Sequence, residues 1–574
     1  MSLPLIATVM LVGLFFGYRL YGGFVARQYA LDDSSPTPAQ RHSDGVDFVP
    51  TRPFYLMGQH FSAIAAAGPI AGPILAAQQF GWLPALVWIS LGVVFIGAVH
   101  DLSTLVASVR HDARSIAEVV KVQLGPRAGT AKLIFIWVAL IYVIVAFTDV
   151  TAATFVQGDP ELAGLTFDFH PGGAVAAASM MYLGLALVMG LVEKYVKPKL
   201  WLQTIIFVPA TLGVVWLGTK LSTLVMLGPT AWGLLILVYC FFASLTPVWL
   251  LLQPRGYLGG FVLYLALAVG VIGLFFGGFE VQQPAFKGFF VGGPTGALFP
   301  FLFVTIACGA CSGFHGLVCS GTTSKQIEKE SHCHPVGYGA MLMEGFVAVI
   351  ALATVMIISN AELAGKGAGT IYGIGLGRFF AVVLGQKHLA FAITFGAMAF
   401  STFVFDTLDV STRLGRYILQ ELFGWTSKVG GMAATGITVG VPMLFLLVAQ
   451  PGSWKIFWTL FGTSNQLLAA LSLMGVTVWL QRLGKKYWYT LAPTIFVSVV
   501  TFSSLVLQMK EAFSPTATRV GQVNGVVALV LTLLAGHLLF LGARALLRPS
   551  TGIGKVGPGS EQFDASGGEV REDV

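Results

Sequence analysis

The chain alternates between long apolar runs and short polar or turn-rich breaks. An α-helix needs about 17–25 predominantly apolar residues to cross the hydrocarbon core of a bilayer. Fifteen runs have about this length, and we predict a transmembrane helix over each of them: 3–26, 57–78, 83–108, 132–157, 172–192, 201–219, 231–253, 257–277, 295–320, 338–359, 389–410, 431–449, 455–480, 488–508 and 523–543. The pattern predicts an all-α, polytopic membrane protein.

One further apolar segment, 371–386, is shorter and has Arg378 inside it and Lys387 at its end. We interpret it as an interfacial or re-entrant segment, and a sixteenth span is the alternative. The expected number of transmembrane helices is therefore about 15–18.

Lysine and arginine are divided unevenly between the two sets of connections. With the N-terminus outside, 24 of the 33 basic residues fall in the inward connections. These connections are 27–56, 109–132, 193–200, 254–256, 321–337, 411–430, 481–487 and the tail from 544. Because cytoplasmic loops carry such an excess, we predict an odd number of spans and a cytoplasmic C-terminus.

The composition excludes several classes of protein. Only 10% of the residues are charged and 56% are hydrophobic, whereas a soluble domain carries roughly 25% charged residues. The net charge of +7 suits loops beside anionic lipid, so no nucleic-acid partner is predicted. The sequence has no G-x-x-x-x-G-K-[ST] phosphate loop, so an ion gradient and not ATP is the expected energy source.

Domain organisation follows from the same pattern. We predict one transmembrane domain over 1–548 and a disordered cytoplasmic tail over 549–574, which is rich in Gly, Ser and acidic residues. The first run, 3–26, lacks a basic n-region and a small-residue cleavage site, and we interpret it as a spanning helix and not a signal peptide.

Two predicted spans contain helix-breaking residues near their middle. In 57–78, the pairs Gly68-Pro69 and Gly72-Pro73 remove two amide donors and lower helix propensity. Carbonyl groups freed inside a membrane need a partner, and a substrate or an ion is one candidate. The alternative is a kinked packing helix. His60 adds a titratable group near the cytoplasmic end.

The second interrupted span is 295–320. Gly309, Ser312, Gly313 and Gly316 interrupt it, and His315 lies within the break. Unwound amides and hydroxyls at this position could hold a small carboxylate.

The same segment carries a cysteine and histidine pattern. Cys308, Cys311, His315 and Cys319 follow helical spacing, and such residues are zinc ligands. Along a regular helix they would spread over ~16 Å, too far for one tetrahedral ion. Small cysteines that pack among apolar neighbours are the alternative to a zinc site.

Carboxylates inside a span point to function because they are costly there. Asp406 and Asp409 lie three residues apart in one predicted span, with Thr402 and Thr407 nearby, and this set could carry protons or ligate Na⁺. The alternative for Asp409 is a structural pair with Arg413. Asp406, deeper in the span, is the stronger candidate for ion coupling, together with His60.

Asn465 and Gln466 lie in the middle of 455–480. Polar amides at such positions usually hold helices together, and substrate binding is the second interpretation. Weaker candidates are His100-Asp101 at the end of the third span and Asp149 in the fourth.

The two interrupted spans run in opposite directions in the predicted topology. Five spans from each give two sets, about 57–219 and 295–480, with extra helices at 3–26, 231–277 and 488–543. Inverted repeats that begin with discontinuous helices and share a site at mid-membrane are a known transporter plan. We predict this arrangement, with Gly68, Pro69, Gly72, Ser312, Gly313, His315, Asn465 and Gln466 as substrate-binding residues.

A set of motifs runs through most of the chain in the order Gly58-Gln59-His60-Phe61, Ala66 to Pro73, Gly97-Ala98-Val99-His100-Asp101, Pro247 to Arg255, Ser312-Gly313-Phe314-His315, Ser320-Gly321-Thr322-Thr323, Gly337 to Glu344, Asp406-Thr407-Leu408-Asp409, Thr412-Arg413 and Phe461 to Leu468. This set resembles the motifs of the carbon starvation protein A (CstA) family.

The resemblance implies a bacterial inner-membrane secondary transporter, associated with nutrient stress, that carries pyruvate or peptides. It also implies the leucine-transporter-type fold and, for pyruvate carriers, proton coupling. We expect no catalytic residues and no cofactor other than the coupling ion, H⁺ or Na⁺. A channel or a membrane metalloprotein that uses the Cys/His group is the competing hypothesis. The oligomeric state is left open.

Overall fold

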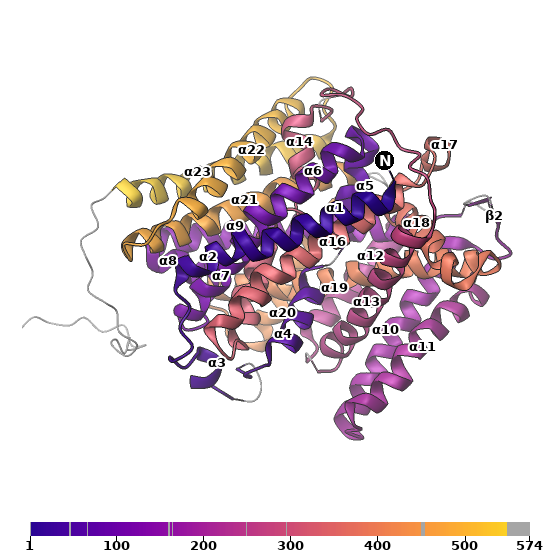
Figure 1. The fold of residues 1–574 in the computed structure, drawn as a ribbon, viewed down its shortest axis with the longest axis horizontal. Coiled ribbons are helices and arrows are strands. Elements are labelled where there is room, and N and C mark those ends of the chain that lie inside the picture. Colours follow the sequence, from indigo (N-terminus) through magenta and orange to yellow (C-terminus); the bar gives the residue numbers. More distant parts are fainter. Residues whose placement is uncertain are drawn as a thin grey trace, which may run out of the picture.

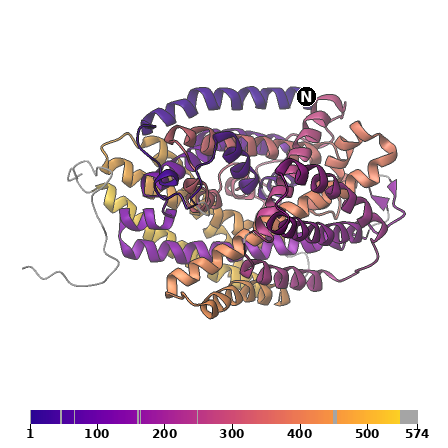
Figure 2. The same ribbon diagram turned by 90° about the horizontal axis from the view of Figure 1, so that it is seen from below.

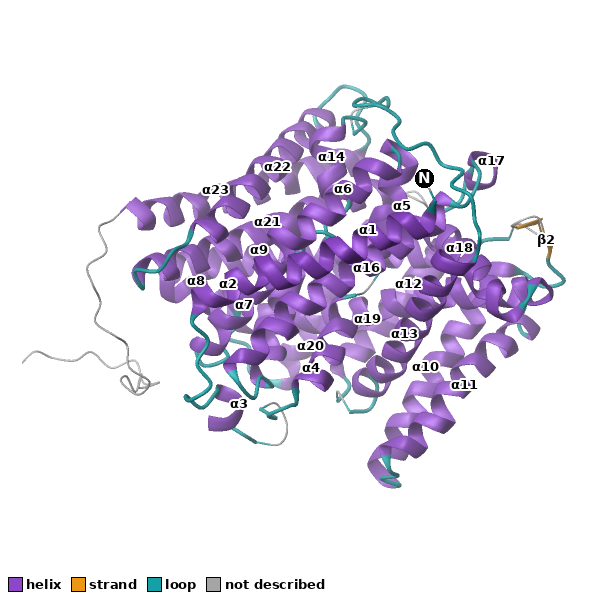
Figure 3. Ribbon diagram, in the orientation of Figure 1, coloured by secondary structure: helices purple, strands orange, loops and turns teal. Residues whose placement is uncertain are grey.

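The computed structural model describes residues 2–547 except 45–47, 66, 159–160, 163–164, 248, 294 and 449–453. Within these residues the chain is almost entirely helical, with one short pair of strands (Figure 3). The tail predicted over 549–574 lies outside the described residues.

The first half of the chain forms thirteen of the described α-helices. They are α1 (Leu3–Phe16), α2 (Gly23–Tyr29), α3 (Pro38–Arg41), α4 (Pro53–Ile64), α5 (Gly68–Phe80), α6 (Trp82–Gly92), α7 (Ala98–Arg110), α8 (Ile116–Leu124), α9 (Pro126–Phe155), α10 (Pro171–Tyr195), α11 (Leu200–Lys220), α12 (Pro229–Leu245) and α13 (Leu252–Phe276). Short π-helical segments, Gly17–Gly22 and Val93–Gly97, join α1 to α2 and α6 to α7 as continuous helices. The antiparallel strands β1 (Glu161–Leu162) and β2 (Leu165–Thr166) connect α9 to α10.

The second half of the chain contributes ten more described α-helices. They are α14 (Leu298–Thr305), α15 (Gly313–Gly321), α16 (Ala340–Met356), α17 (Asn360–Leu363), α18 (Ala368–Leu384), α19 (Leu389–Phe423), α20 (Lys428–Val448), α21 (Trp454–Arg482), α22 (Trp488–Ala512) and α23 (Arg519–Leu547). A π-helical segment, His334–Gly339, leads directly into α16.

The prediction of an all-α, multi-pass membrane protein is confirmed. Among the described residues, 12 helices are long and apolar enough to span a membrane, or 13 when the bent pair α4–α5 is taken as one span. Helices α12 and α18 are apolar but shorter, and α14 and α15 are the halves of the predicted span 295–320. These short and broken elements account for the difference from the predicted number of spans.

Both interrupted spans are broken, but not at every predicted residue, since Pro69, Gly72 and Pro73 lie within helix α5 and His315 and Gly316 lie within α15. Helices α4 and α5 meet at an angle of 48° between Ile64 and Gly68. Helix α14 ends at Thr305 and α15 begins at Gly313, so the segment between them is not helical.

The segment predicted as interfacial or re-entrant is helix α18. It packs antiparallel to the first part of α19, since Gly377 contacts Ile393 and Gly369 contacts Phe400. Gly369 also contacts Thr154 in the last turn of α9, and Arg378 donates a hydrogen bond of 3.1 Å to the Ile357 carbonyl just after α16. The whole helix therefore lies toward one end of the bundle, a placement that fits the re-entrant interpretation.

Helix α1 begins at the N label and runs toward the side of the molecule where the yellow C-terminal end of α23 lies (Figures 1 and 2). An odd number of spans and a cytoplasmic C-terminus stay predictions from the distribution of basic residues.

Three connections predicted to face inward meet at one end of the bundle. Arg110 forms an ion pair of 2.8 Å with Glu330, and the Thr51 amide donates to the Gln326 carbonyl. The backbone N–H of Ser331 donates to Asp33, which lowers the pKa of this carboxyl group below its ordinary value. These contacts link 27–56, 109–132 and 321–337, as the predicted alternation of spans requires.

Burial divides the helices into a centre and a periphery. The apolar part of α21 is completely buried, whereas α11 and α23 are largely exposed. On α11, more than half of the surface of Leu200, Trp201, Ile205, Ile206 and Trp216 is exposed. In a membrane such faces contact lipid, and α21 lies in the interior where polar groups need protein partners.

A substitution at Gly72 tests the close packing of the broken helices. A Cβ at this position would lie 2.6 Å from the Thr305 carbonyl oxygen and 3.2 Å from the Ile306 Cα. We expect Gly72→Ala to lower stability by about 1–3 kcal/mol, because overpacking forces the backbones apart. The measurement is the melting temperature of the purified protein in detergent.

Gly440 provides the matched control for this substitution. It lies in α20, and a Cβ added there would have no neighbouring atom within 4 Å, so Gly440→Ala should keep or slightly raise the melting temperature. Equal melting temperatures for the two variants would contradict the packing described here.

Candidate functional site

The two helix breaks lie against each other in the interior. A Cβ at Gly68 would overlap the Sγ atom of Cys308, and one at Gly72 would press on the Thr305 carbonyl. Residue numbers rise along α5 as they fall along the partner segment, so the two segments are antiparallel. Glycine permits this approach because it has no Cβ.

The carbonyl groups released at the end of α14 are bonded by side chains of other helices. Gln466 Nε2 donates to the Phe303 carbonyl at 2.9 Å, and Trp458 Nε1 donates to the Thr305 carbonyl at 3.2 Å. Trp88 Nε1 lies 3.3 Å from the Ile306 carbonyl. Protein donors from α6 and α21 therefore hold this end of the break in place.

Asn465 holds the other side of the same break. Its Oδ1 accepts a hydrogen bond of 2.9 Å from the Phe314 amide, in the first turn of α15. Its Nδ2 lies 3.1 Å from Ser312 Oγ and 3.2 Å from Cys308 Sγ. The structure thus brings the predicted residues of α21 directly to the predicted break, where Gly313 packs against the backbone of α21.

A chain of buried titratable side chains begins next to this break. Asp101 Oδ1 lies 2.8 Å from His100 Nδ1, and Asp101 Oδ2 lies 2.9 Å from His315 Nδ1. On its other side, His315 Nε2 lies 3.2 Å from Glu344 Oε2. No side chain of the four is more than 1% exposed.

His60 lies near this cluster but has its own partner. Its Nδ1 is 2.8 Å from the hydroxyl of Thr323, in the turn after α15. Its Nε2 lies 3.9 Å from Cys319 Sγ. These contacts join α4 to the C-terminal end of α15, so each half of one broken span packs on a half of the other.

Three of the four candidate zinc ligands contact different partners, and the fourth is buried. Cys308 contacts Asn465, Cys319 contacts His60, His315 contacts Asp101, and Cys311 is buried. Across the described part of the chain, no three His, Cys, Asp or Glu side chains form a group that could hold a metal ion.

The predicted coupling carboxylates belong to a second polar cluster, centred on Arg255. Arg255 Nε donates to Asp406 Oδ1 at 2.8 Å, and its Nη1 forms an ion pair with Asp409 Oδ2. The Tyr239 hydroxyl donates to the same Asp409 oxygen at 2.8 Å. Arg255 is completely buried, whereas 17% of the Asp406 side chain is exposed.

The alternative pairing of Asp409 with Arg413 is not what the structure shows. Arg413 Nη2 donates instead to the Ala243 and Thr246 carbonyls at the end of α12. The hydroxyls of Thr402 and Thr407 bond within their own helix, to Met398 Sδ and to the Phe403 carbonyl. They therefore do not point at the Asp406 carboxylate.

Two central residues, Arg255 and Glu344, are not among the predicted site residues. Arg255 falls in the predicted inward connection 254–256, but α13 begins at Leu252 and buries it in the first turn. Glu344 lies inside a predicted span, so the cost of burying a carboxylate is a usable signal. In the sequence it stands out only as the end of the motif that begins at Gly337.

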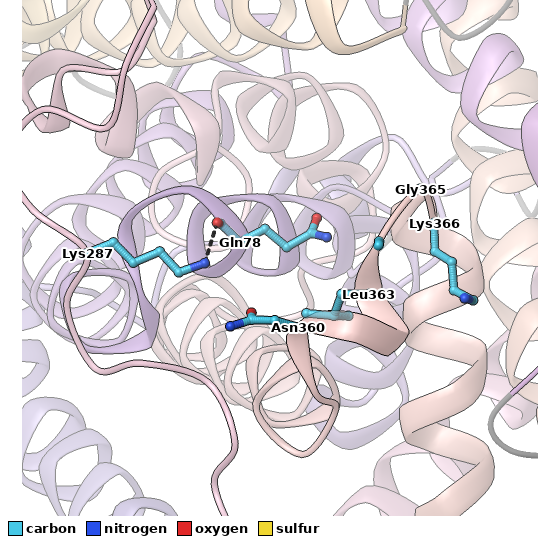
Figure 4. A pocket seen from close by; sticks show the side chains of 7 residues that line it. Gln78, Lys287, Asn360, Leu363, Gly365 and Lys366 are labelled. Atoms are coloured by element: carbon cyan, nitrogen blue, oxygen red, sulfur yellow. Dashed lines mark hydrogen bonds between the residues drawn. The ribbon is translucent and has the colours of Figure 1, made fainter.

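A cavity of about 260 Å³ lies at the end of α5, away from the breaks. Figure 4 shows Lys287 Nζ bonded to the Gln78 carbonyl, with the side chains of Asn360 and Lys366 on the other side. The seven lining residues include two lysines and no acid.

Comparison with protein-family profiles shows which family the chain belongs to. A profile described as "Carbon starvation protein CstA" matches residues 2–365 and 359–504. The chain belongs to the CstA family. The resemblance seen in the sequence motifs is therefore confirmed.

Curated CstA-family relatives match over most of their length. The "Pyruvate/proton symporter BtsT" of Escherichia coli K12 is 31% identical, over 86% of this chain and 80% of its own. The "Peptide transporter CstA" of Bacillus subtilis 168 is 32% identical, over 92% and 94%. The E. coli protein of that name is 34% identical, over 87% and 80%.

Solved structures give a more distant match. A manganese transporter of Eremococcus coleocola aligns over 87% of this chain and 97% of its own, with 12% identity and a TM-score of 0.42.

Removing the cation of the Arg255 cluster tests its role in stability. We expect Arg255→Met to lower stability by about 3–5 kcal/mol, because two carboxylates then remain in the interior without their partner. The measurement is the melting temperature of the purified protein. The triple variant Arg255→Met/Asp406→Asn/Asp409→Asn, which has no charge at these positions, should recover most of the loss. A triple variant no more stable than the single one would contradict this account.

Proposed function

We propose that this protein is a secondary active transporter that takes up pyruvate or short peptides by proton symport during nutrient limitation. The names of its CstA-family relatives support this proposal, since one is a pyruvate/proton symporter and others are peptide transporters. The same relatives favour transport over a channel or a metalloprotein, and we assign the chain no catalytic role. A bacterial inner membrane, with the N-terminus outside, is the proposed location.

The observation that carries the proposal is the antiparallel contact of two broken helices. Helix ends that meet inside a membrane place backbone amides and carbonyls where no water can satisfy them. In transporters built this way the substrate binds at the breaks, and the positive ends of half-helices point at anionic groups. The N-terminal end of α15 at Gly313 is such an end.

We place the carboxylate of the substrate beside this end of α15. Gly68, Pro69 and Gly72 form the facing wall from α5, and Ser312, Gly313 and His315 line the α15 side. Asn465 and Gln466 act from α21 by fixing the shape of the break. Both candidate substrates present a carboxylate, so this site accounts for either.

Arg255, Asp406 and Asp409 have a separate role in this proposal. They join α13 to α19 through a buried ion pair that is only partly open to solvent at Asp406. We propose that the pair holds these helices together while α4–α5 and α14–α15 change position. Asp406 and Asp409 are thus positioning residues for the conformational change.

Uptake by purified protein in liposomes tests the proposed function. We expect accumulation of labelled pyruvate or a labelled dipeptide when the outside is more acidic than the inside, and loss of accumulation with a protonophore. A competition panel of pyruvate, lactate, dipeptides and tripeptides, with and without Na⁺, identifies the substrate and the coupling ion. If none of these compounds is accumulated under either ion gradient, the proposed function is wrong.

Asn465→Ala tests the position of the site. It leaves the buried Phe314 amide without its acceptor, a loss of about 1–3 kcal/mol. We expect the apparent affinity for substrate to fall about tenfold, which corresponds to ~1.4 kcal/mol. Asn524→Ala is the matched control, because Asn524 lies on the peripheral helix α23 and accepts a hydrogen bond from the Tyr142 hydroxyl of α9. Equal effects of the two variants on affinity would contradict a site at the break.

A further inference from the structure

The buried chain His100–Asp101–His315–Glu344 crosses from α7 through α15 to α16 and has a defined hydrogen-bond order. A carboxylate accepts hydrogen bonds but does not donate them. Each Asp101 oxygen faces the Nδ1 atom of one histidine, at 2.8 Å and 2.9 Å. Both histidines therefore present Nδ1–H to Asp101, and their Nε2 atoms remain as acceptors when the rings are neutral.

This order leaves two acceptors facing each other at the end of the chain. His315 Nε2 and Glu344 Oε2 are 3.2 Å apart. Neither oxygen of Glu344 has a hydrogen-bond partner among the described residues, and the side chain is completely buried. A buried carboxylate without a donor is unfavourable, and a proton bound to Glu344 removes this cost. His315 Nε2, 3.2 Å from Glu344 Oε2, is the titratable group that faces it.

We propose that the His315–Glu344 pair, oriented by Asp101, is the proton-coupling site of this transporter. The inference rests on the proposed function and adds the residues that bind the transported proton. One proton binds to the Glu344 carboxylate from one side of the membrane and leaves as H⁺ to the other side. No bond other than O–H or N–H forms or breaks.

The His315–Glu344 pair lies beside the break, so the distance between its two side chains depends on the position of α15. His315 is the third residue of α15, directly after the break. Glu344 lies one turn from Ala348, whose Cβ is 2.9 Å from the position of a Cβ at Gly309 within the break. A movement of α15 relative to α16 therefore changes the distance between the two proton-binding atoms, which links proton release to the conformational change.

The surrounding groups do not replace this proton. His60 bonds to Thr323, and Lys132 Nζ donates to the Leu468 carbonyl and to Ser472 Oγ. The other titratable neighbours on α15 and on the preceding segment are the thiols of Cys308, Cys311 and Cys319. No described lysine or arginine forms an ion pair with Glu344, whereas Arg255 compensates both Asp406 and Asp409. For this reason we assign proton binding to Glu344 in preference to Asp406.

The test compares two transport modes in Glu344→Gln, which keeps the shape of the side chain but cannot release a proton. In liposomes, we expect uphill uptake driven by a proton gradient to fall at least about tenfold. Exchange of internal unlabelled substrate for external labelled substrate, which needs no net proton movement, should continue. Uphill uptake by Glu344→Gln equal to that of the unmodified protein would overturn the proposal.

Controls separate this outcome from misfolding and from failure of the proposed function. Glu193→Gln removes a carboxylate from the last turns of α10, far along the chain from the broken helices, and should leave both modes unchanged. If Glu344→Gln loses exchange as well as uphill uptake, coupling has not been separated from binding and the proposal is rejected. If the unmodified protein shows uptake under neither ion gradient, the proposed function itself fails, whereas uptake driven by Na⁺ alone would overturn the proton site.

Infrared spectroscopy provides a direct readout of the proton without transport. The purified protein should show the C=O stretching band of a protonated carboxyl group that disappears at high pH. We expect Glu344→Gln to lack this band and Glu193→Gln to retain it. A titrating band that is unchanged in Glu344→Gln would place the proton elsewhere and overturn the assignment.

Discussion

The contact between two interrupted helices is the constraint on which the rest of this structure depends. Gly72 can approach the Thr305–Ile306 backbone, and Gly68 the Cys308 side chain, only because glycine has no Cβ. Once the helices are broken, each released carbonyl or amide needs a donor or an acceptor from the protein, since lipid supplies none. The amides of Asn465 and Gln466 and the indole of Trp88 meet this need. The position of α21 at the centre of the bundle follows from it.

Two buried polar clusters compensate the charge of buried carboxylates in different ways. Around Arg255, one guanidinium faces two carboxylates and a tyrosine, so the charge is compensated by a fixed cation. Around His315, two carboxyl groups face imidazoles, which carry a positive charge only when protonated. A fixed cation favours a permanent structural contact, whereas an imidazole can gain and lose charge. This physical difference between arginine and histidine is the basis for proposing a structural role for the first cluster and proton binding for the second.

The peripheral helices face lipid with apolar side chains. Helices such as α11 and α23 expose large apolar side chains, and in a membrane these contact lipid without any loss of free energy. Helix association then relies on close packing and on hydrogen bonds, since lipid is as apolar as the side chains themselves. The buried polar clusters accordingly lie on α4–α5, α7, α13–α16, α19 and α21.

The sequence by itself determined the class of the protein, most of the spans and the two breaks, because these depend on local composition. A run of apolar residues or a Gly-Pro pair acts on its own segment, wherever that segment is placed. Contacts across the bundle could not be obtained this way. Arg255 contacts Asp406 and Glu344 faces His315, and these partners lie 151 and 29 residues away in the chain. Local sequence therefore does not reveal them. Only the packing of the helices decided which buried charges met a cation and which met an imidazole.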